Sequence, residues 1–176
     1  LQMAEVLFRQ SEERLREAVD RHDLELPQRE EVPRALRDLV SEGVLQDLAH
    51  GQKRFFHQTL LEYAMARWLR TGKAAADRNR LLDELRREDT QRRRLHFWPV
   101  VRLLLAIAEL NDYQAICRRL DLGHWPAFRA AALAAAVREE PDALRALVPM
   151  ALSCGPLHER ALLEAVQSLP QSRVAV

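Results

Sequence analysis

His57 is the residue of this chain whose type and position are best suited to chemistry. It stands between the short apolar run Phe55-Phe56 and a helical pattern that begins near Thr59. An imidazole N–H can donate to a phosphate oxygen, and the ring gains charge near neutral pH. Helix N-termini attract anions, because their N–H groups and the helix dipole face that way. His57 is therefore a candidate anion contact, and the alternative is a structural histidine that caps the end of a strand.

Two local patterns position His57. Short apolar runs on either side of a polar tip predict a small hairpin over residues 44–56. Apolar residues then recur at helical spacing over residues 60–69. Thr59 and Glu62 have the spacing of a capping box, so we expect Thr59 to cap this helix. His57 is thus expected at the point where a strand turns into a helix.

Two further helices are expected before the hairpin. The first covers residues 4–19, where an apolar stripe faces a charged side. The second opens at Val32-Pro33 and ends at Gly43, since proline suits a first turn and glycine a helix end. Its expected buried residues are Leu36, Leu39 and Val40. Helix, helix, two-stranded wing and helix is the order of a winged-helix module, which we assign to residues 1–70.

One segment of this module resembles a known family. The residues that carry the likeness are Phe56-x-His57-x-x-x-x-Glu62-Tyr63-x-x-Ala66, preceded by Leu39-Val40-Ser41-Glu42-Gly43-Val44-Leu45. They are similar to the end of the winged-helix module in signal-transducing ATPases with numerous domains, the NACHT and NLR-like class of STAND NTPases. The likeness covers about residues 33–70. The chain departs from the family pattern at Leu60-Leu61, where Phe-Gln is frequent, and at Met65, where a small residue is usual.

The resemblance implies a role for His57. In that family the module packs on a nucleotide-binding domain, and its histidine contacts bound ADP and helps to hold the resting state closed. It therefore implies that His57 contacts an ADP phosphate in a longer protein that binds ADP or ATP with Mg²⁺. It also implies an upstream nucleotide-binding domain, a role in signal transduction for immunity or defence, and an oligomer on activation.

The chain alone is not expected to be an enzyme. It has no Gly-x-x-x-x-Gly-Lys-Ser/Thr loop, which is the element that cradles nucleotide phosphates in such NTPases. Because the sequence begins with Leu1 rather than with Met, we expect a fragment of a longer protein.

From residue 71 onwards, regular proline and glycine punctuation predicts a helical half. Asp77 and Asn111-Asp112 are expected to cap two of its helices. Short helices joined by tight links favour antiparallel helix pairs stacked in series over residues 71–176. The expected helices cover residues 78–88, 100–110, 113–122, 127–139, 143–153 and 157–169.

A short internal repeat favours this stacking. Ala132-Leu133-x-x-Ala136-Val137 recurs 29 residues later as Ala161-Leu162-x-x-Ala165-Val166. A period near 30 residues built from two helices resembles HEAT-like α-solenoids, and an irregular helical bundle is the alternative. The solenoid predicts that the Leu and Val of both copies face one core. The expected fold class is mainly α, with a winged helix followed by helical repeats.

Arginines gather at one predicted helix junction. Over residues 71–102, nine lysines and arginines stand against five acidic residues. The junction itself carries Arg86, Arg87, Arg92, Arg93 and Arg94. This cluster is a candidate patch for an anion or an acidic partner. The alternative is a solvated helix end, where the helix dipole favours arginine.

Other side chains give no further candidate site. The six histidines lack the spacing of zinc ligands, so no metal site is expected. Cys117 lies on an apolar helix face and is expected to be an inert buried thiol. Since Cys117 and Cys154 form no disulfide framework, a reducing, cytoplasmic compartment is expected. The aromatic residues at helix starts are expected to anchor the core rather than to stack on bases. These are Trp98, Trp125 and Phe128.

Two functions remain open at this stage. The first is a regulatory and sensing part of a STAND NTPase, in which the helical repeats bind a protein or other ligand. The second is a stand-alone helical scaffold for protein or nucleic acid. The net charge of +1 gives no overall attraction to nucleic acid or membrane, and residues 33–42, before the wing, have balanced charge. Nucleic-acid binding is therefore the less favoured role, and no membrane association is expected.

Overall fold

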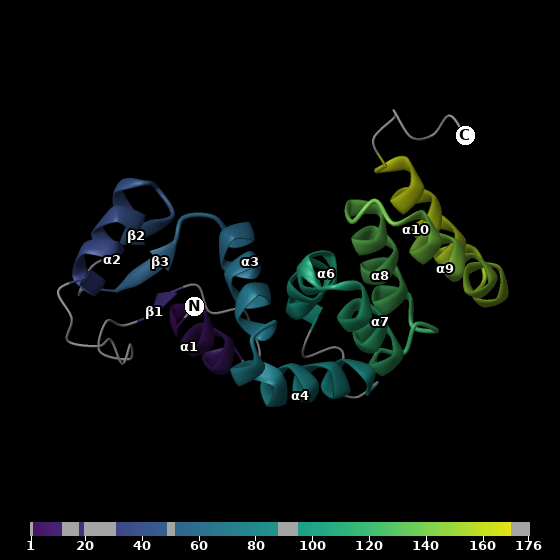
Figure 1. Cartoon of the computed structure of the whole chain (residues 1–176), viewed down its shortest axis with the longest axis horizontal. Helices are drawn as coiled ribbons and strands as arrows, with labels where there is room; N and C mark the ends of the chain where they lie inside the picture. The colour runs from purple at the N-terminus through teal and green to yellow at the C-terminus, as the bar shows by residue number, and fades with distance from the viewer. Residues whose placement is uncertain (1, 12–17, 20–30, 49–51, 88–94, 170–176) are drawn as a thin grey trace.

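The computed structural model describes residues 2–11, 18–19, 31–48, 52–87 and 95–169 of the chain. This part is mainly helical, as predicted, and its helices follow an open arc (Figure 1). The α-helices are α1 (Gln2–Gln10), α2 (Glu31–Ser41), α3 (Gln58–Leu69), α4 (Ala75–Arg86), α6 (Trp98–Ile107), α7 (Leu110–Arg119), α8 (Trp125–Val137), α9 (Pro141–Cys154) and α10 (Pro156–Gln167). Two short 3-10 turns, η3 (Gly72–Ala74) and η4 (Leu95–Phe97), precede α4 and α6.

A small antiparallel sheet lies at the N-terminal side. The hairpin of β2 (Leu45–Asp47) and β3 (Lys53–Phe55) confirms the predicted one. A third strand, β1 (Ala18–Val19), pairs with β3, so the strand order is β1-β3-β2. The prediction of one helix over residues 4–19 is therefore wrong at its end. Helix α1 ends at Gln10, and Ser11 then bonds back to the Leu7 carbonyl through its hydroxyl at 2.6 Å.

Helix α2 ends as predicted but buries less than predicted. The Gly43 N–H donates to the Val40 carbonyl and the Val44 N–H to the Leu39 carbonyl, at 3.1 and 2.9 Å. With Gly43 at φ +70°, this is a Schellman termination, which favours glycine. Of the three expected buried residues, Leu36 and Val40 are half-buried, whereas Leu39 is 40% exposed. Helix α2 packs chiefly on β2, and Leu39 lies outside this contact.

The predicted capping box at the start of α3 is wrong. The helix begins at Gln58 with His57 at the N-cap, and no side chain caps it. Thr59 is exposed within the first turn, so it is past the capping position. Glu62 is buried and accepts a hydrogen bond from the Gln58 Nε2 at 2.8 Å. This contact binds one turn of α3 to the next and leaves the N-terminus of the helix open.

The helices after residue 70 begin near their predicted prolines but earlier than their predicted caps. Pro99, Pro126 and Pro141 lie in first turns, as expected, and Pro156 lies in the first turn of α10 rather than only ending the helix before it. Helix α4 starts at Ala75, so Asp77 lies inside its first turn, where it pairs with Arg9 and Arg80 instead of capping. Helix α7 likewise starts at Leu110 with Glu109 at the N-cap, which places Asn111-Asp112 within the helix.

The helices of the second half are packed in a row. Helix α3 packs on α6, α6 on α8, and α8 on α10, while α9 contacts both α8 and α10 (Figure 1). On the other side of the row, α4 contacts α7. One hydrophobic core runs through this row from α1 to α10. The core therefore continues across residue 70, where the sequence predicts a domain boundary.

The repeated segments lie in α8 and α10 and share part of the predicted burial pattern. The alanines of both copies are buried, and Leu133 and Leu162 pack partly against the core. The prediction is wrong for the valines, because Val137 is 70% exposed and Val166 is 39% exposed. Each valine follows a buried alanine by one residue, which is about 100° around a helix and brings it to the solvent side.

Helix α8 is surrounded by its neighbours because its sides are made of alanine. Its buried alanines are Ala127, Ala130, Ala131, Ala132, Ala134, Ala135 and Ala136. Small side chains let the adjoining helices approach closely. As a result, little space remains around these alanines, because a well-packed interior has few voids that could accept a larger side chain.

Replacing Ala135 with Leu should lower the free energy of unfolding by about 1–3 kcal/mol, because added methylenes strain a filled core. Val137→Leu, two residues on and exposed, is the matched control and should change it by less than about 0.5 kcal/mol. Urea unfolding followed by circular dichroism measures both. Equal stability of the two variants would show that the alanine faces of α8 are not closely packed.

Candidate functional site

His57 lies where the sequence places it, between β3 and α3. It is exposed, and its extended backbone (φ −120°, ψ 139°) makes it the N-cap residue of α3. Its ring stands edge-on to Phe56, with centroids 4.5 Å apart. Phe56 is itself 48% exposed, although its N–H is held by the Val44 carbonyl of the hairpin. Both rings are thus presented to the outside from a fixed backbone.

The N-terminus of α3 can receive an anion. The Leu60 and Leu61 N–H groups donate to the His57 carbonyl, whereas those of Gln58 and Thr59 precede the helical ladder. No side chain caps this end. Open N–H groups, the positive end of the dipole and an imidazole therefore meet at one exposed place.

The body of α3 holds that end in position. Its buried residues include Leu61, Met65 and Leu69, which belong to the main core. On the exposed face, Arg67 lies over the Tyr63 ring at 6.0 Å from its centroid, and its guanidinium donates to the Tyr63 hydroxyl at 3.4 Å. The site is thus the N-terminus of a helix that is held by the core, and the side chains of Phe56 and Tyr63 are exposed near it.

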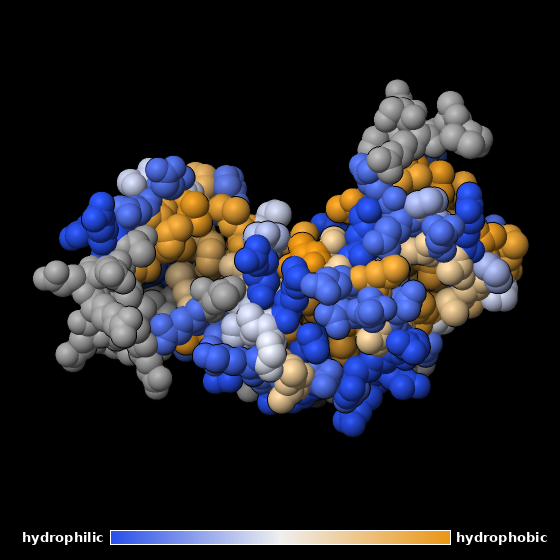
Figure 2. Space-filling view, viewed as in Figure 1, coloured by the Kyte–Doolittle hydropathy of each residue, from blue (hydrophilic) through white to orange (hydrophobic). Residues whose placement is uncertain are grey.

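The arginine cluster lies elsewhere. Arg86 and Arg87 are exposed at the end of α4, which lies beside α7 and away from the N-terminus of α3 (Figure 1). Figure 2 shows hydrophilic side chains along the lower edge of the molecule, where α4 runs. The remaining cluster members, Arg92, Arg93 and Arg94, lie outside the described residues.

The two described arginines act on a local ion pair. The Arg119 guanidinium donates to both carboxylate oxygens of Asp83, at 2.8 and 2.6 Å, and ties α7 to α4. This hydrogen bonding holds the pKa of Asp83 below its usual range, and the charges of Arg87 and Arg86 lower it further. Arg86 and Arg87 thus lie exposed at the end of α4, near the ion pair that joins α4 to α7.

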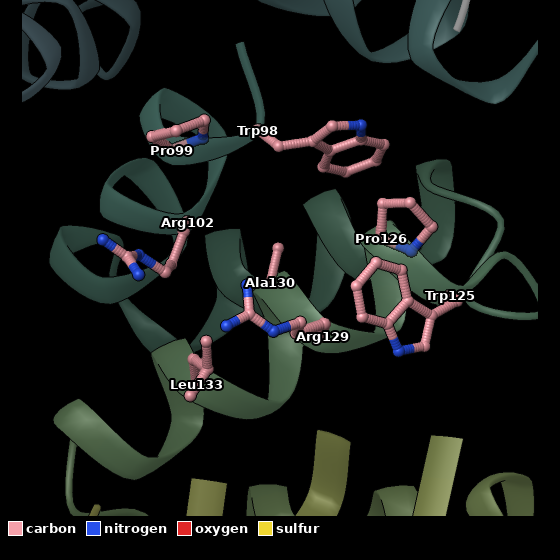
Figure 3. Close-up of a pocket in the computed structure, with 8 residues that line it drawn as sticks. All are labelled: Trp98, Pro99, Arg102, Trp125, Pro126, Arg129, Ala130 and Leu133. Carbon is pink, nitrogen blue, oxygen red and sulfur yellow. The ribbon is translucent and has the colours of Figure 1, made fainter. Parts of the chain in front are cut away.

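A pocket of about 190 Å³ between the starts of α6 and α8 is absent from the sequence-based candidates (Figure 3). Its lining contains the same five-residue pattern twice, Trp98-Pro99-x-x-Arg102 and Trp125-Pro126-x-x-Arg129, together with Ala130 and Leu133. The pattern repeats after 27 residues, and this spacing is the signal that could have revealed the pocket. Trp98 is half-buried and Trp125 is 39% exposed, so neither is a fully buried core anchor, whereas Phe128 is one.

A larger cavity of about 600 Å³ lies between α7 and α9. Tyr113 and Cys117 form part of its wall, and the Tyr113 hydroxyl donates to the Ala131 carbonyl at 3.1 Å. Burial raises the pKa of the Cys117 thiol to about 11. The thiol is therefore protonated at neutral pH. Cys117 is half-buried rather than fully buried as predicted, whereas Cys154 is exposed.

Comparison with models of protein families, with curated proteins and with solved structures finds no match to this chain. Among the described residues, no three His, Cys, Asp or Glu side chains gather as metal ligands would. Within the same residues, every helix is too short or too polar to cross a membrane.

The two cysteines should differ in reactivity. At pH 8 Ellman's reagent should modify Cys154 rapidly and Cys117 slowly, because the thiolate of Cys117 becomes populated only as the pH approaches about 11. The absorbance of the released product measures the two phases. Cys154→Ser should remove the fast phase, and Cys117→Ser should keep it. A fast phase that survives in Cys154→Ser would contradict the burial of Cys117.

Proposed function

We propose that this chain is the regulatory part of a signal-transducing NTPase of the STAND class. In this proposal a winged-helix module helps to hold a nucleotide-bound resting state, and the helical half receives a ligand or partner. The observation that carries the proposal is the exposed His57 at the uncapped N-terminus of α3. A nucleotide phosphate is the kind of group that this arrangement favours.

The N-terminal elements support the winged-helix assignment. They run helix, strand, helix, hairpin and helix, and the strands form one sheet. A hairpin alone is marginally stable in water, whereas a third strand and helical cover give it a stable base. Strand β1 supplies the third strand, and the α3 core supplies the cover. The sheet thus fixes the end of β3, from which the chain turns through His57 into α3.

The role of His57 would be that of a contact rather than of a catalyst. The chain has no phosphate-cradling loop, so Mg²⁺ and most of the nucleotide would be held by a neighbouring domain. The His57 imidazole and the α3 amides would meet a phosphate oxygen from outside. A contact made only with the nucleotide-bound state favours that state, which is the requirement for a resting-state lock.

The helical half supports a receiving role. A row of packed helices with a repeated motif is what a HEAT-like solenoid requires, and such rows offer long surfaces to partners. Since α3 packs directly on α6, a partner that altered the row would act on the same helix that presents His57. Two sites on one packed body can bias one another if the packing has two arrangements.

A stand-alone helical scaffold is the second candidate. The continuous core from α1 to α10 favours it, because a scaffold needs a single body and no second domain. The two candidate functions differ in their need for nucleotide. Only the regulatory function requires nucleotide and assigns a role to His57.

Replacing His57 with Ala in the NTPase that the proposal implies should speed ADP release roughly ten-fold and raise ligand-independent activity. A hydrogen bond to a charged oxygen contributes about 1.5–3 kcal/mol, which is sufficient for such a change. The melting temperature should change little, since the His57 side chain is exposed and caps nothing. Release of a fluorescent ADP analogue, signalling without added ligand and a thermal melt measure the three quantities.

Thr59→Ala is the matched control, because Thr59 is exposed in the same first turn and makes no cap. It should leave ADP release unchanged. If His57→Ala releases ADP no faster than Thr59→Ala, the nucleotide contact is disproved and the scaffold becomes the better account.

A further inference from the structure

Arginines occupy the same position in two successive helices of the row. Arg102 is the fifth residue of α6, and Arg129 is the fifth residue of α8. Each follows a Trp-Pro pair at the helix start, and both line the pocket of Figure 3. The two copies of the motif are therefore comparable, helix for helix.

One of these arginines is fully paired. The Arg129 guanidinium donates through Nε and a terminal nitrogen to the two carboxylate oxygens of Glu164, at 2.9 and 2.5 Å. Its guanidinium carbon also lies 5.8 Å from the centroid of the Trp125 ring. Glu164 is the ninth residue of α10, the next helix in the row. Helix α8 thus satisfies its arginine with a carboxylate from the helix that follows.

The other arginine has no such carboxylate. The next helix after α6 is α8, and its ninth residue is Leu133. Leu133 lines the pocket with Arg102, and Figure 3 shows these two at one end, the indole rings at the other and Arg129 between them. Arg102 is half-buried and makes no hydrogen bond or ion pair within the described residues. Arg102 therefore lacks a carboxylate partner, whereas Arg129, at the same position in the next helix of the row, has one.

The surrounding charge strengthens the case for an acidic group. Hydrogen bonding to Arg129 lowers the pKa of Glu164, and the charges of Arg129, Arg160 and Arg102 lower it further. A single carboxylate thus lies within the field of three guanidinium groups. A second carboxylate would be favoured there, and paired donors bind carboxylates best in the two-pronged geometry that Arg129 already uses.

We propose that this pocket binds an acidic peptide segment of a partner protein. A carboxylate of the segment would pair with Arg102, as Glu164 pairs with Arg129, and a neighbouring apolar side chain would enter between the Trp98 and Trp125 rings. The inference deepens the proposed function, on which it rests, by naming where the helical half holds its partner. It is tested on residues other than His57, so the two can fail separately.

The aromatic geometry favours a peptide over a single-stranded nucleic acid. Base stacking needs open ring faces in series. The Trp125 ring carries Arg129 over one face, its Nε1 donates to the Leu157 carbonyl at 3.1 Å, and Phe128 is fully buried. A pocket of about 190 Å³ is too small for a row of stacked bases.

The test is a selection from a phage-displayed library of random 12-residue peptides on the whole chain, with Arg102→Gln and Leu133→Glu in parallel. Leu133→Glu places a carboxylate on α8 at the position that Glu164 has on α10, so it should fill the pocket from within. The wild-type chain should enrich peptides with Asp or Glu beside Leu, Ile or Phe. A selected peptide should then bind both variants at least about ten-fold more weakly, measured by tryptophan fluorescence.

Arg118→Gln is the control, because Arg118 is exposed on α7 and lies outside this pocket. This variant should bind the selected peptide as tightly as the wild-type chain does. Thermal melts of all variants show that they remain folded, and Arg102→Gln keeps the test decisive if Leu133→Glu does not fold. Three results would overturn the proposal. They are a selection with no acidic enrichment, equal binding of the selected peptide to wild type and Arg102→Gln, and an Arg102-dependent affinity for a fluorescent 12-nucleotide oligo-dT in place of peptide.

Discussion

The Phe8 ring joins the two halves of this molecule. It lies between Trp68 and Phe97, with centroids 5.0 and 5.1 Å away, and so brings α1, α3 and the start of the helical row into one aromatic contact. Aromatic pairs at such distances add about 0.5–1.5 kcal/mol beyond the area they bury. Because all three rings belong to the main core, the sheet-bearing module is anchored on α6 rather than tethered to it. The position of His57 depends on this anchor through α3.

The helical row shows how a repeat can keep its geometry and change its chemistry. Arg102 and Arg129 occupy equivalent positions, yet α10 offers Glu164 to one and α8 offers Leu133 to the other. The ion pair of Arg129 with Glu164 joins α8 to α10. Leu133 offers no carboxylate to Arg102, and both residues line the pocket.

Local signals in the sequence predicted part of the local structure, namely the hairpin, the prolines of the first turns and the termination at Gly43. The predicted helix caps at Thr59, Asp77 and Asn111-Asp112 were wrong, because each helix begins earlier than the capping pattern indicates. Features that depend on distant partners were missed. Strand β1 forms because β3 lies beside it, and the exposure of Val137 depends on where α6 and α10 approach α8. The unpaired state of Arg102 emerges only when two helices are compared in space.

Hydrogen exchange of the Phe8→Leu variant tests most directly whether the two halves form one body. The substitution keeps an apolar side chain but removes the ring that contacts both Trp68 and Phe97. If the core is shared, mass spectrometry should show faster amide exchange in peptides from α3 and also from α6 and α8, relative to the wild type. Faster exchange confined to α1 and α3, with α6 and α8 unchanged, would show that the module and the helical row open independently. It would contradict the coupling on which this account rests.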